Sequence, residues 1–317
     1  MVVSKSFSLT LEKSCAPTLN GPTQSSENAP FHVAITLLLY LLLVLMLMFY
    51  LHGSIFFLLL LRSTSPLVSV FSPPPLKNVA VFGGSGGVGQ LICANFKARG
   101  ISFRPLSRST TISMDLLKAS LQDIRAAVDG CDAVVIATGT TAFPTKKWVD
   151  GNNPEAIDNL ATKKIVEAIP STVKHVVLIS SIGTLRTGQF PFVVLNLFGV
   201  LDAKREGEKA VVAGGVEKGF ISTILRPGRL IGGPWTNDDL AKLFQISNER
   251  NDSEGIGVSI ESGDSVVGDA SRDRVAAVAV KCLVAGNGGE FCVADDNNDP
   301  CGSSDEEWGE RLSAIRP

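Results

Sequence analysis

Histidine and tyrosine are scarce in this sequence of 317 residues, and their positions limit its chemistry. Of the three histidines, His32 and His52 flank or lie within a long apolar run, which leaves only His175 in the globular part. We therefore expect neither a histidine-based zinc site nor a Ser-His-Asp triad, and no bound metal. Both tyrosines, Tyr40 and Tyr50, also lie in the apolar run, so the globular part has no phenol.

Cysteine pairs and an excess of charge are absent as well. The six cysteines show no CxxC spacing, and Cys93, Cys131 and Cys292 lie in apolar runs. We interpret these cysteines as small buried hydrophobic residues rather than as a disulfide or metal framework. The net charge is −2 with acids and bases nearly balanced, so nothing indicates a nucleic-acid partner.

The first quarter of the chain differs in composition from the rest. Residues 1–30 are rich in Ser, Thr, Asn and Pro and have no hydrophobic period, which predicts a disordered leader. Residues 31–61 are apolar, and no charge occurs between Glu27 and Arg62. The run is longer than the roughly 20 residues that cross a bilayer, so it predicts one N-terminal transmembrane helix. Residues 62–76 are rich in Ser and Pro and predict a semi-extended linker.

Two alternatives to a membrane anchor remain for residues 31–61. The run is either a cleaved targeting segment, or sequence translated upstream of the real start of the protein. If it is an anchor, Glu27 before the run and Arg62 after it place the globular domain on the cytoplasmic or stromal side of a membrane.

From Lys77 onward, strand and helix patterns alternate. Asn78 to Phe82 is a short apolar strand that runs directly into a glycine-rich turn and an amphipathic helix. Repeated strand–helix units of this length predict a doubly wound parallel α/β sheet, a Rossmann fold, over residues 77–317. The alternation weakens after Gly233, so we expect residues 233–317 to form a small C-terminal substrate lobe.

The glycine-rich turn has GxxGxxG spacing, with Gly83, Gly86 and Gly89 between the strand and the helix. One glycine permits the tight turn, one lets the backbone approach a pyrophosphate, and one allows close packing of helix on strand. The N-terminus of the following helix offers N–H groups and a positive dipole end to phosphate. This segment therefore predicts a dinucleotide site.

The end of the second strand, Ser107-Arg108-Ser109, discriminates between the two nicotinamide dinucleotides. NAD-binding Rossmann domains place an acid near this point to hold the ribose diol, whereas this chain has no acid before Asp115. A guanidinium binds a 2′-phosphate through bidentate hydrogen bonds. Arg108 therefore favours NADP over NAD, and the alternative is a solvated loop arginine.

Five motifs carry a resemblance to a known family: VAVFGGSGGVG, GCDAVVIATGT, VVLISSIGT, NLFGVLDAKREGE and ILRPGRLIGGP. The chain resembles an atypical short-chain dehydrogenase/reductase of the NAD(P)-binding, NmrA-like type. It is especially similar to plant and cyanobacterial members, many of them chloroplast proteins. The resemblance covers about Lys77 to Arg316. It implies an NADP(H)-binding Rossmann domain, a chloroplast location, and a C-terminal region that caps the cofactor cleft.

The resemblance also implies a role for residues that follow several strands. The pyrophosphate turn would consist of Gly83, Gly84, Ser85, Gly86, Gly87, Val88 and Gly89. The 2′-phosphate would contact Arg108, the adenine Asp115, and the ribose Ala137, Thr138 and Gly139. Ser180 and Ser181 would lie beneath the nicotinamide, Lys204 would bind its ribose, and Pro227 and Gly228 would line its pocket.

The family's usual catalytic tyrosine is missing. Lys204 occupies the place of the family's lysine, but Val200 stands four residues earlier, where the tyrosine is expected. In the typical mechanism the tyrosine is the general acid or base, and the lysine lowers its pKa and orients the ribose. The remaining candidate catalytic residues are Lys204 and Ser181. Lys204 has a second interpretation, as part of a solvated helix face paired with Glu208.

Two functional classes remain. The first is an NADPH-dependent reductase of a flavin, quinone or conjugated tetrapyrrole, in which solvent or a carboxylate supplies the proton. The alternative is a non-catalytic NADP(H)-responsive regulator, or a membrane-tethered assembly factor with a protein partner. Trp148 and Trp235 are predicted in loops at the ligand-binding edge of the sheet, where each either stacks on a substrate or anchors its loop.

Overall fold

The computed structural model of the protein describes residues 37–44, 46, 76–233, 257–296 and 305–315. The chain divides into two units, Met1–Phe71 and Ser72–Pro317. In the first unit, residues 37–44 are helical and their large apolar side chains are exposed. Over the described ranges, no helix is both long and apolar enough to cross a bilayer.

Several predictions for the N-terminal part fall outside the described residues. They concern the leader at residues 1–30, most of the membrane span at 31–61 and the linker up to residue 75. Trp235, one of the two predicted loop tryptophans, is outside them too.

The second unit is built on an eight-stranded sheet with the order β3-β2-β1-β4-β5-β6-β10-β8. The strands are β1 (Asn78–Phe82), β2 (Ser102–Ser107), β3 (Ile112–Ser113), β4 (Ala133–Ile136), β5 (His175–Ile179), β6 (Ile221–Pro227), β8 (Gly257–Ser262) and β10 (Gly289–Asp296). All neighbouring strands are parallel except β10 and β8. The strand order reverses between β1 and β4, which opens a crevice at their carboxyl ends. The predicted α/β Rossmann fold is confirmed.

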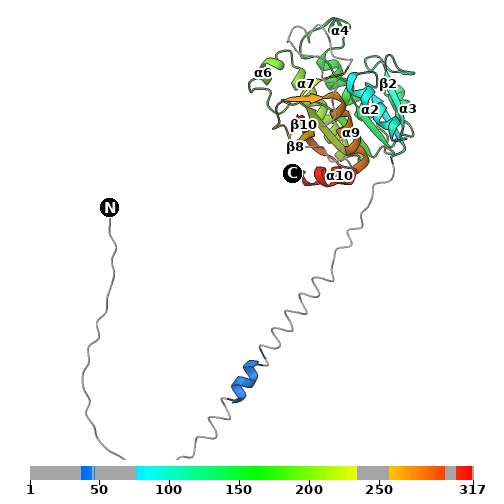
Figure 1. Ribbon diagram of the computed structural model, residues 1–317. Helices are drawn as coiled ribbons and strands as arrows, with labels where there is room; N and C mark the ends of the chain where they lie inside the picture. The colour runs from blue at the N-terminus through cyan, green and yellow to red at the C-terminus, as the bar shows by residue number, and fades with distance from the viewer. Residues whose placement is uncertain (1–36, 45, 47–75, 234–256, 297–304, 316–317) are drawn as a thin grey trace, which may run out of the picture. The chain divides into compact units, whose positions relative to one another are not determined.

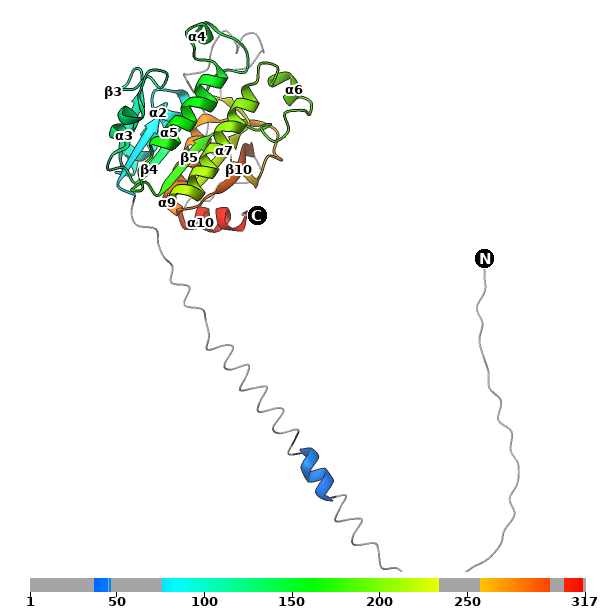
Figure 2. The ribbon, with the colours of Figure 1, turned by 180° about the vertical axis from the view of Figure 1, so that it is seen from behind.

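Helices cover both faces of this sheet, as comparison of Figure 1 with Figure 2 shows. One face carries α2 (Gly87–Ala98), α9 (Arg272–Ala285) and α10 (Asp305–Ala314), and the other carries α3 (Leu121–Val128), α5 (Thr162–Ala168) and α7 (Val200–Lys218). Strand β1 serves both cores, because Val79 and Val81 join one and Ala80 and Phe82 join the other. Such doubly buried strands are typical of parallel sheets.

The C-terminal region, predicted to form a small substrate lobe, is described in part, and whether it binds substrate stays a prediction. Its described part extends the main sheet, since β10 pairs with β6 and β8 pairs with β10. Helix α9 shares a core with α2, and α10 adds Trp308 and Leu312 to that core. The physical reason lies in β10, where Phe291 to Ala294 are all buried, so this strand needs cover on both faces. A second, two-stranded sheet joins β7 (Arg229–Ile231) to β9 (Asp269–Ser271).

The segments that follow β4 and β5 contain short elements near the carboxyl edge of the sheet. Helix α4 (Lys146–Val149) and the π-helix η1 (Glu155–Ala161) follow β4, and η1 continues directly into α5. Helix α6 (Phe192–Leu195) lies between β5 and α7. π-Helical turns are rare and are frequent at functional sites, which directs attention to the residues of η1.

Candidate functional site

The glycine-rich turn between β1 and α2 is closed by contacts that only glycine allows. Gly83 has a φ of 78°, and a Cβ there would lie 2.6 Å from the carbonyl oxygen of Ala137. A Cβ on Gly89 would lie 2.1 Å from the carbonyl oxygen of Gly83. Helix α2 begins after Gly86 without a side-chain cap and with no acidic residue in its first turn. Its N-terminus therefore remains available to an anion.

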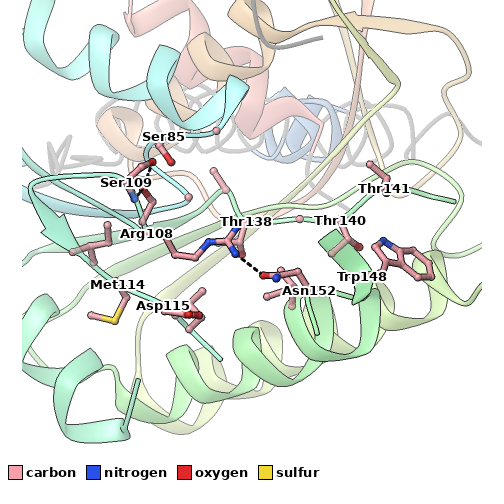
Figure 3. A pocket seen from close by; sticks show the side chains of 18 of the residues that line it. Ser85, Arg108, Ser109, Met114, Asp115, Thr138, Thr140, Thr141, Trp148 and Asn152 are labelled. Atoms are coloured by element: carbon pink, nitrogen blue, oxygen red, sulfur yellow. Dashed lines mark hydrogen bonds between the residues drawn. The ribbon is translucent and has the colours of Figure 1, made fainter. Parts of the chain in front are cut away.

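A cavity of about 420 Å³ lies at the carboxyl ends of β1, β2 and β4, and we call it the β1–β4 cavity (Figure 3). It is lined by three segments that are far apart in the sequence: the glycine-rich turn, the segment after β2 and the segment after β4. Eight predicted cofactor residues line it: Gly83, Ser85, Gly86, Arg108, Asp115, Ala137, Thr138 and Gly139.

The other predicted residues lie outside this cavity. Gly84, Gly87, Val88 and Gly89 shape the turn or begin α2, and a Cβ on Gly84 would lie 2.8 Å from Cβ of Pro105. Ser180, Ser181, Lys204, Pro227 and Gly228 do not line it either. A Cβ on Gly228 would lie 2.3 Å from the carbonyl oxygen of Gly268, so this glycine serves close packing of two backbone segments. Contact of these residues with a nicotinamide stays a prediction.

Buried polar atoms of the β1–β4 cavity match a polar ligand. In the part of the chain that the structure describes, six buried side-chain atoms lack a hydrogen-bond partner. Three of them, Thr138 Oγ1, Thr145 Oγ1 and Trp148 Nε1, belong to residues that line this cavity. Because buried polar groups are nearly always hydrogen-bonded, such atoms indicate a missing partner. Together with the open turn, Thr138 Oγ1 fits the phosphates and hydroxyls of a dinucleotide.

Arg108 crosses from the end of β2 towards the segment before η1 (Figure 3). Its Nη1 donates a 3.1 Å hydrogen bond to Oδ1 of Asn152, which is an uncharged partner. Asp115 lines the same wall, and its Oδ1 accepts a 3.1 Å hydrogen bond from the backbone N–H of Leu117. The guanidinium thus borders the cavity, while the carboxylate also holds its own turn.

Lys204 of α7 is paired with a carboxylate that sequence inspection did not identify. Its Nζ donates a 2.7 Å hydrogen bond to Oδ1 of Asp158 on η1, and the hydroxyl of Thr140 donates to the other oxygen of Asp158. The interpretation that Lys204 pairs with Glu208 on a solvated face is therefore wrong. A Cβ on Gly207 would lie 2.3 Å from the carbonyl oxygen of Asp158, so this glycine lets α7 approach η1.

The ammonium of Lys204 lies directly beside the wall of the β1–β4 cavity. A Cβ on Gly139, which lines that cavity, would lie 3.2 Å from Nζ of Lys204. Thr138, Asp158, Ser180 and Lys204 also line a second cavity of about 10 Å³, room for about one water molecule. The lysine is thus within reach of a ligand at Gly139, but its charge is already compensated.

A buried ion pair underlies the end of β5. Arg226 of β6 and Glu208 of α7 are both fully buried, with Arg226 Nη2 2.8 Å from Glu208 Oε2. The hydroxyls of Ser180 and Thr184 donate to Oε1 of the same carboxylate, at 2.5 Å and 2.9 Å. Burial disfavours the charged carboxylate, but the hydrogen bond and charge of Arg226 outweigh it and hold the pKa of Glu208 below its usual range.

This pair was missed in the sequence, although an arginine within the apolar segment ILRPG was a signal for it. A charge in a buried strand requires a buried partner. Of the predicted nicotinamide-side hydroxyls, the pair holds that of Ser180, which donates to Glu208. Ser181 instead donates a local 3.1 Å bond to the carbonyl of Ile182.

Residues expected to be structural have that character. His175 begins β5, at the opposite end of the strand from the β1–β4 cavity, and its Nε2 lies 2.7 Å from Oγ1 of Thr223. Cys93, Cys131 and Cys292 are buried and free, as predicted, and burial raises the pKa of the Cys93 thiol to about 11. Trp148, predicted in a loop and either to stack on a substrate or to anchor that loop, lies instead in the short helix α4. It lines the cavity and packs edge-on against Phe198, with ring centroids 6.1 Å apart.

Comparison with known proteins agrees with this site. A family model described as NAD(P)H-binding matches residues 83–285, well over half of the chain. Protein TIC 62, chloroplastic, of Oryza sativa subsp. japonica is 37% identical over 126 residues, which are 39% of this chain and 24% of that protein. The chain thus spans about a quarter of the length of that relative.

Two solved structures share the fold at low sequence identity. The oxidoreductase ylbE of Lactococcus lactis is 15% identical with a TM-score of 0.55, and the match covers 76% of this chain and 99% of that one. ChuY, an anaerobillin reductase of Escherichia coli O157:H7, is 15% identical with a TM-score of 0.50, covering 69% of this chain and 97% of that one. With its glycine-rich turn, its Rossmann sheet and the extent of the family match, the chain belongs to the NAD(P)H-binding family, and its resemblance to atypical short-chain dehydrogenases/reductases is confirmed.

Proposed function

We propose that the protein binds NADP(H) and reduces an acceptor that needs no catalytic tyrosine, such as a flavin, a quinone or a conjugated tetrapyrrole. The observation that carries the cofactor preference is the guanidinium of Arg108 on the wall of the β1–β4 cavity. Its partner Asn152 is uncharged, whereas a 2′-phosphate would offer stronger, charge-assisted hydrogen bonds. Arg108 would therefore exchange Asn152 for the phosphate of NADP(H).

The groups near the predicted nicotinamide end favour an acceptor that takes its proton from solvent. Among the described residues there, Ser180 donates to Glu208, and Thr140 and Lys204 donate to Asp158. Each group is thus bound to a carboxylate rather than directed at a substrate. A ketone needs a protein acid at its oxygen, whereas reduced flavins and quinones exchange protons readily with water.

Different residues would bind different parts of the cofactor. The turn from Gly83 to Gly89 would hold the pyrophosphate, Arg108 the 2′-phosphate and Lys204 the nicotinamide ribose, with Asp158 keeping the ammonium beside Gly139. When bound, NADPH would supply a hydride, and one proton from water would complete the two-electron reduction of the acceptor.

A second function is favoured by the place of the missing tyrosine. Val200 is buried in an apolar cluster with Ile182, Phe192 and Leu201, so the position is filled by packing rather than left for a polar group. This arrangement suits a non-catalytic NADP(H)-binding regulator or an assembly factor that recruits a protein partner. In that case Lys204 would serve cofactor binding alone.

We also propose a chloroplast location and membrane association through residues 31–61, with the globular domain on the stromal side. The location is supported by the TIC 62 relative, which is named as chloroplastic. The anchor is supported by the uncharged apolar run between Glu27 and Arg62. Fractionation of chloroplast membranes followed by an alkaline wash would test it: release of the protein by alkali would contradict an anchor.

The deciding experiment combines binding with turnover on the purified full chain in detergent. Calorimetric titration with NADPH, NADP⁺ and NADH would measure cofactor affinity, and loss of absorbance at 340 nm would follow NADPH oxidation with FMN, a benzoquinone and biliverdin. We expect NADPH to bind more tightly than NADH and at least one acceptor to be reduced. Tight NADPH binding without turnover would select the regulator, and absence of NADPH binding would contradict both functions.

A further inference from the structure

The end of the β1–β4 cavity farthest from Asp115 is formed by Trp148 and its neighbours (Figure 3). Trp148 packs edge-on against Phe198, and Phe198 packs edge-on against Phe143, with ring centroids 6.1 Å and 6.2 Å apart. Phe143 and Trp148 follow β4, whereas Phe198 lies between β5 and α7. The three rings, which we call the aromatic cluster, hold the indole in place from two separate segments.

Two hydrogen-bond donors at this end have no partner in the described part of the chain. The indole Nε1 of Trp148 and the hydroxyl of Thr145 are both buried, and both residues line the cavity. The indole N–H can only donate. Figure 3 shows the indole nitrogen on the side of Thr140 and Thr141. The hydroxyls of these two residues donate to Asp158 and to the carbonyl of Phe143, and neither accepts a hydrogen bond from the indole.

A ligand that satisfies this end must therefore present hydrogen-bond acceptors and tolerate apolar walls. Neither donor carries a charge, so a phosphate would gain less here than at the glycine-rich turn or at Arg108. The adjoining surface is apolar too, since Phe198, which packs on the indole, is exposed. A planar conjugated ring with carbonyl oxygens on its edge matches both features, because its edge accepts hydrogen bonds and its faces pack on aromatic rings.

We propose that Trp148 and Thr145 form the acceptor subsite, in which the indole N–H and the threonine hydroxyl bind a carbonyl edge of a flavin or quinone ring. The inference rests on the proposed reductase function and assigns its substrate-positioning residues. The ring would lie against the aromatic cluster, on the Thr140 side of the cavity. The dinucleotide would occupy the turn, Arg108 and Asp115.

The test uses the full chain in detergent with two variants that remove one donor each and keep the side-chain shape. Trp148→Phe keeps an aromatic ring without the N–H, and Thr145→Val replaces the hydroxyl by a methyl group. Val149→Ala is the matched control, because this neighbouring side chain is 88% exposed and does not line the cavity. NADPH affinity by calorimetry reports whether each variant retains its cofactor site and fold.

Affinity for FMN and for tetramethyl-1,4-benzoquinone would be measured by equilibrium dialysis with NADP⁺ present, together with the KM of each in NADPH oxidation. We expect Trp148→Phe to weaken binding of at least one probe about tenfold and Thr145→Val to weaken it several-fold, with NADPH affinity within twofold of the original. The probe that responds distinguishes a flavin from a quinone. Val149→Ala should have the same probe affinity, KM and NADPH affinity as the original chain.

Three results would overturn the subsite. They are no binding of either probe by the unmodified chain, probe affinity unchanged in both variants, or a parallel loss of NADPH affinity, which would assign Trp148 to the cofactor. If a probe binds and depends on Trp148 but NADPH is not oxidised, the subsite stands and the proposed reductase function fails.

Discussion

Lys204 donates a 2.7 Å hydrogen bond to Asp158, and the two side chains are only 12% and 2% exposed. The lysine keeps its place on α7 while the tyrosine four residues earlier is replaced by Val200. A buried ammonium without a phenol to act on requires another anionic partner, and η1 supplies one. The carboxylate of Asp158 therefore stabilises the buried ammonium of Lys204 in a site that lacks the family's tyrosine.

Removing the charge of Asp158 should destabilise the protein strongly. Asp158→Asn leaves the ammonium of Lys204 buried without a counter-charge, at a cost of about 3–5 kcal/mol in the free energy of unfolding. Urea denaturation measures this loss. The control is Glu206→Gln, since Glu206 forms half-exposed pairs with Lys209 and Lys163 and should change stability by less than about 1 kcal/mol. Equal stability losses in the two variants would contradict a special role for Asp158.

Gly207 should not tolerate a side chain. Gly207→Ala would place Cβ 2.3 Å from the carbonyl oxygen of Asp158, so α7 and η1 would have to move apart, at a cost of roughly 1–3 kcal/mol. Because the Lys204–Asp158 pair depends on this approach, NADPH affinity should fall as well. Gly188→Ala is the matched control, since a Cβ there meets nothing within 4 Å. Calorimetric melting measures the change in stability, and NADPH titration measures the change in affinity.

Glu208 should make stability depend on acid pH. Its pKa is lowered in the folded protein from its ordinary value of about 4.5, so the unfolded chain binds the proton more readily. This contribution to stability is complete above about pH 4.5 and is lost as the pH falls through the lower folded pKa. Glu208→Gln should lower stability at pH 7 and flatten this acid dependence. Urea titrations between pH 3 and 7 test it, and an unchanged slope in the variant would contradict the assignment.

Restoring the tyrosine should not restore ketone reduction. Val200 is 3% exposed within an apolar cluster, so Val200→Tyr would overpack it at a cost of roughly 1–3 kcal/mol. Lys204 would still be paired with Asp158 rather than with the new phenol. We expect a lower melting temperature and no NADPH-dependent reduction of simple ketones. Appearance of ketone reductase activity would show that the remaining machinery is intact.

Arg108 should determine the choice between the two dinucleotides. Hydrogen bonds to a charged group contribute about 1.5–3 kcal/mol, so Arg108→Ala should weaken NADPH binding about 10- to 150-fold and leave NADH binding nearly unchanged. Asn152→Ala removes the uncharged partner of Arg108 and should leave NADPH affinity within about threefold. Calorimetry with both cofactors decides, and equal losses for NADPH and NADH would refute a 2′-phosphate contact.

Local pattern alone determined much of this protein. The apolar segments of the strands, the spacing of Gly83, Gly86 and Gly89, and the arginine after β2 identify a Rossmann sheet with a dinucleotide turn, because each depends on neighbours within a few residues. The missing phenol at Val200 was evident from the resemblance to the short-chain dehydrogenase/reductase family. These features could be predicted without knowledge of which segments meet in space.

Tertiary structure alone decided the partners of the charged residues. Asp158 lies 46 positions from Lys204, and Glu208 lies 18 from Arg226, and no periodicity links either pair. The same holds for Trp148 and Phe198, which meet because the segments after β4 and β5 converge at one edge of the sheet. It also holds for the pairing of β10 with β6. Packing of distant segments sets these contacts. A buried charge needs a charged or hydrogen-bonding partner and a buried apolar face needs another apolar surface, and the fold determines which residues supply them.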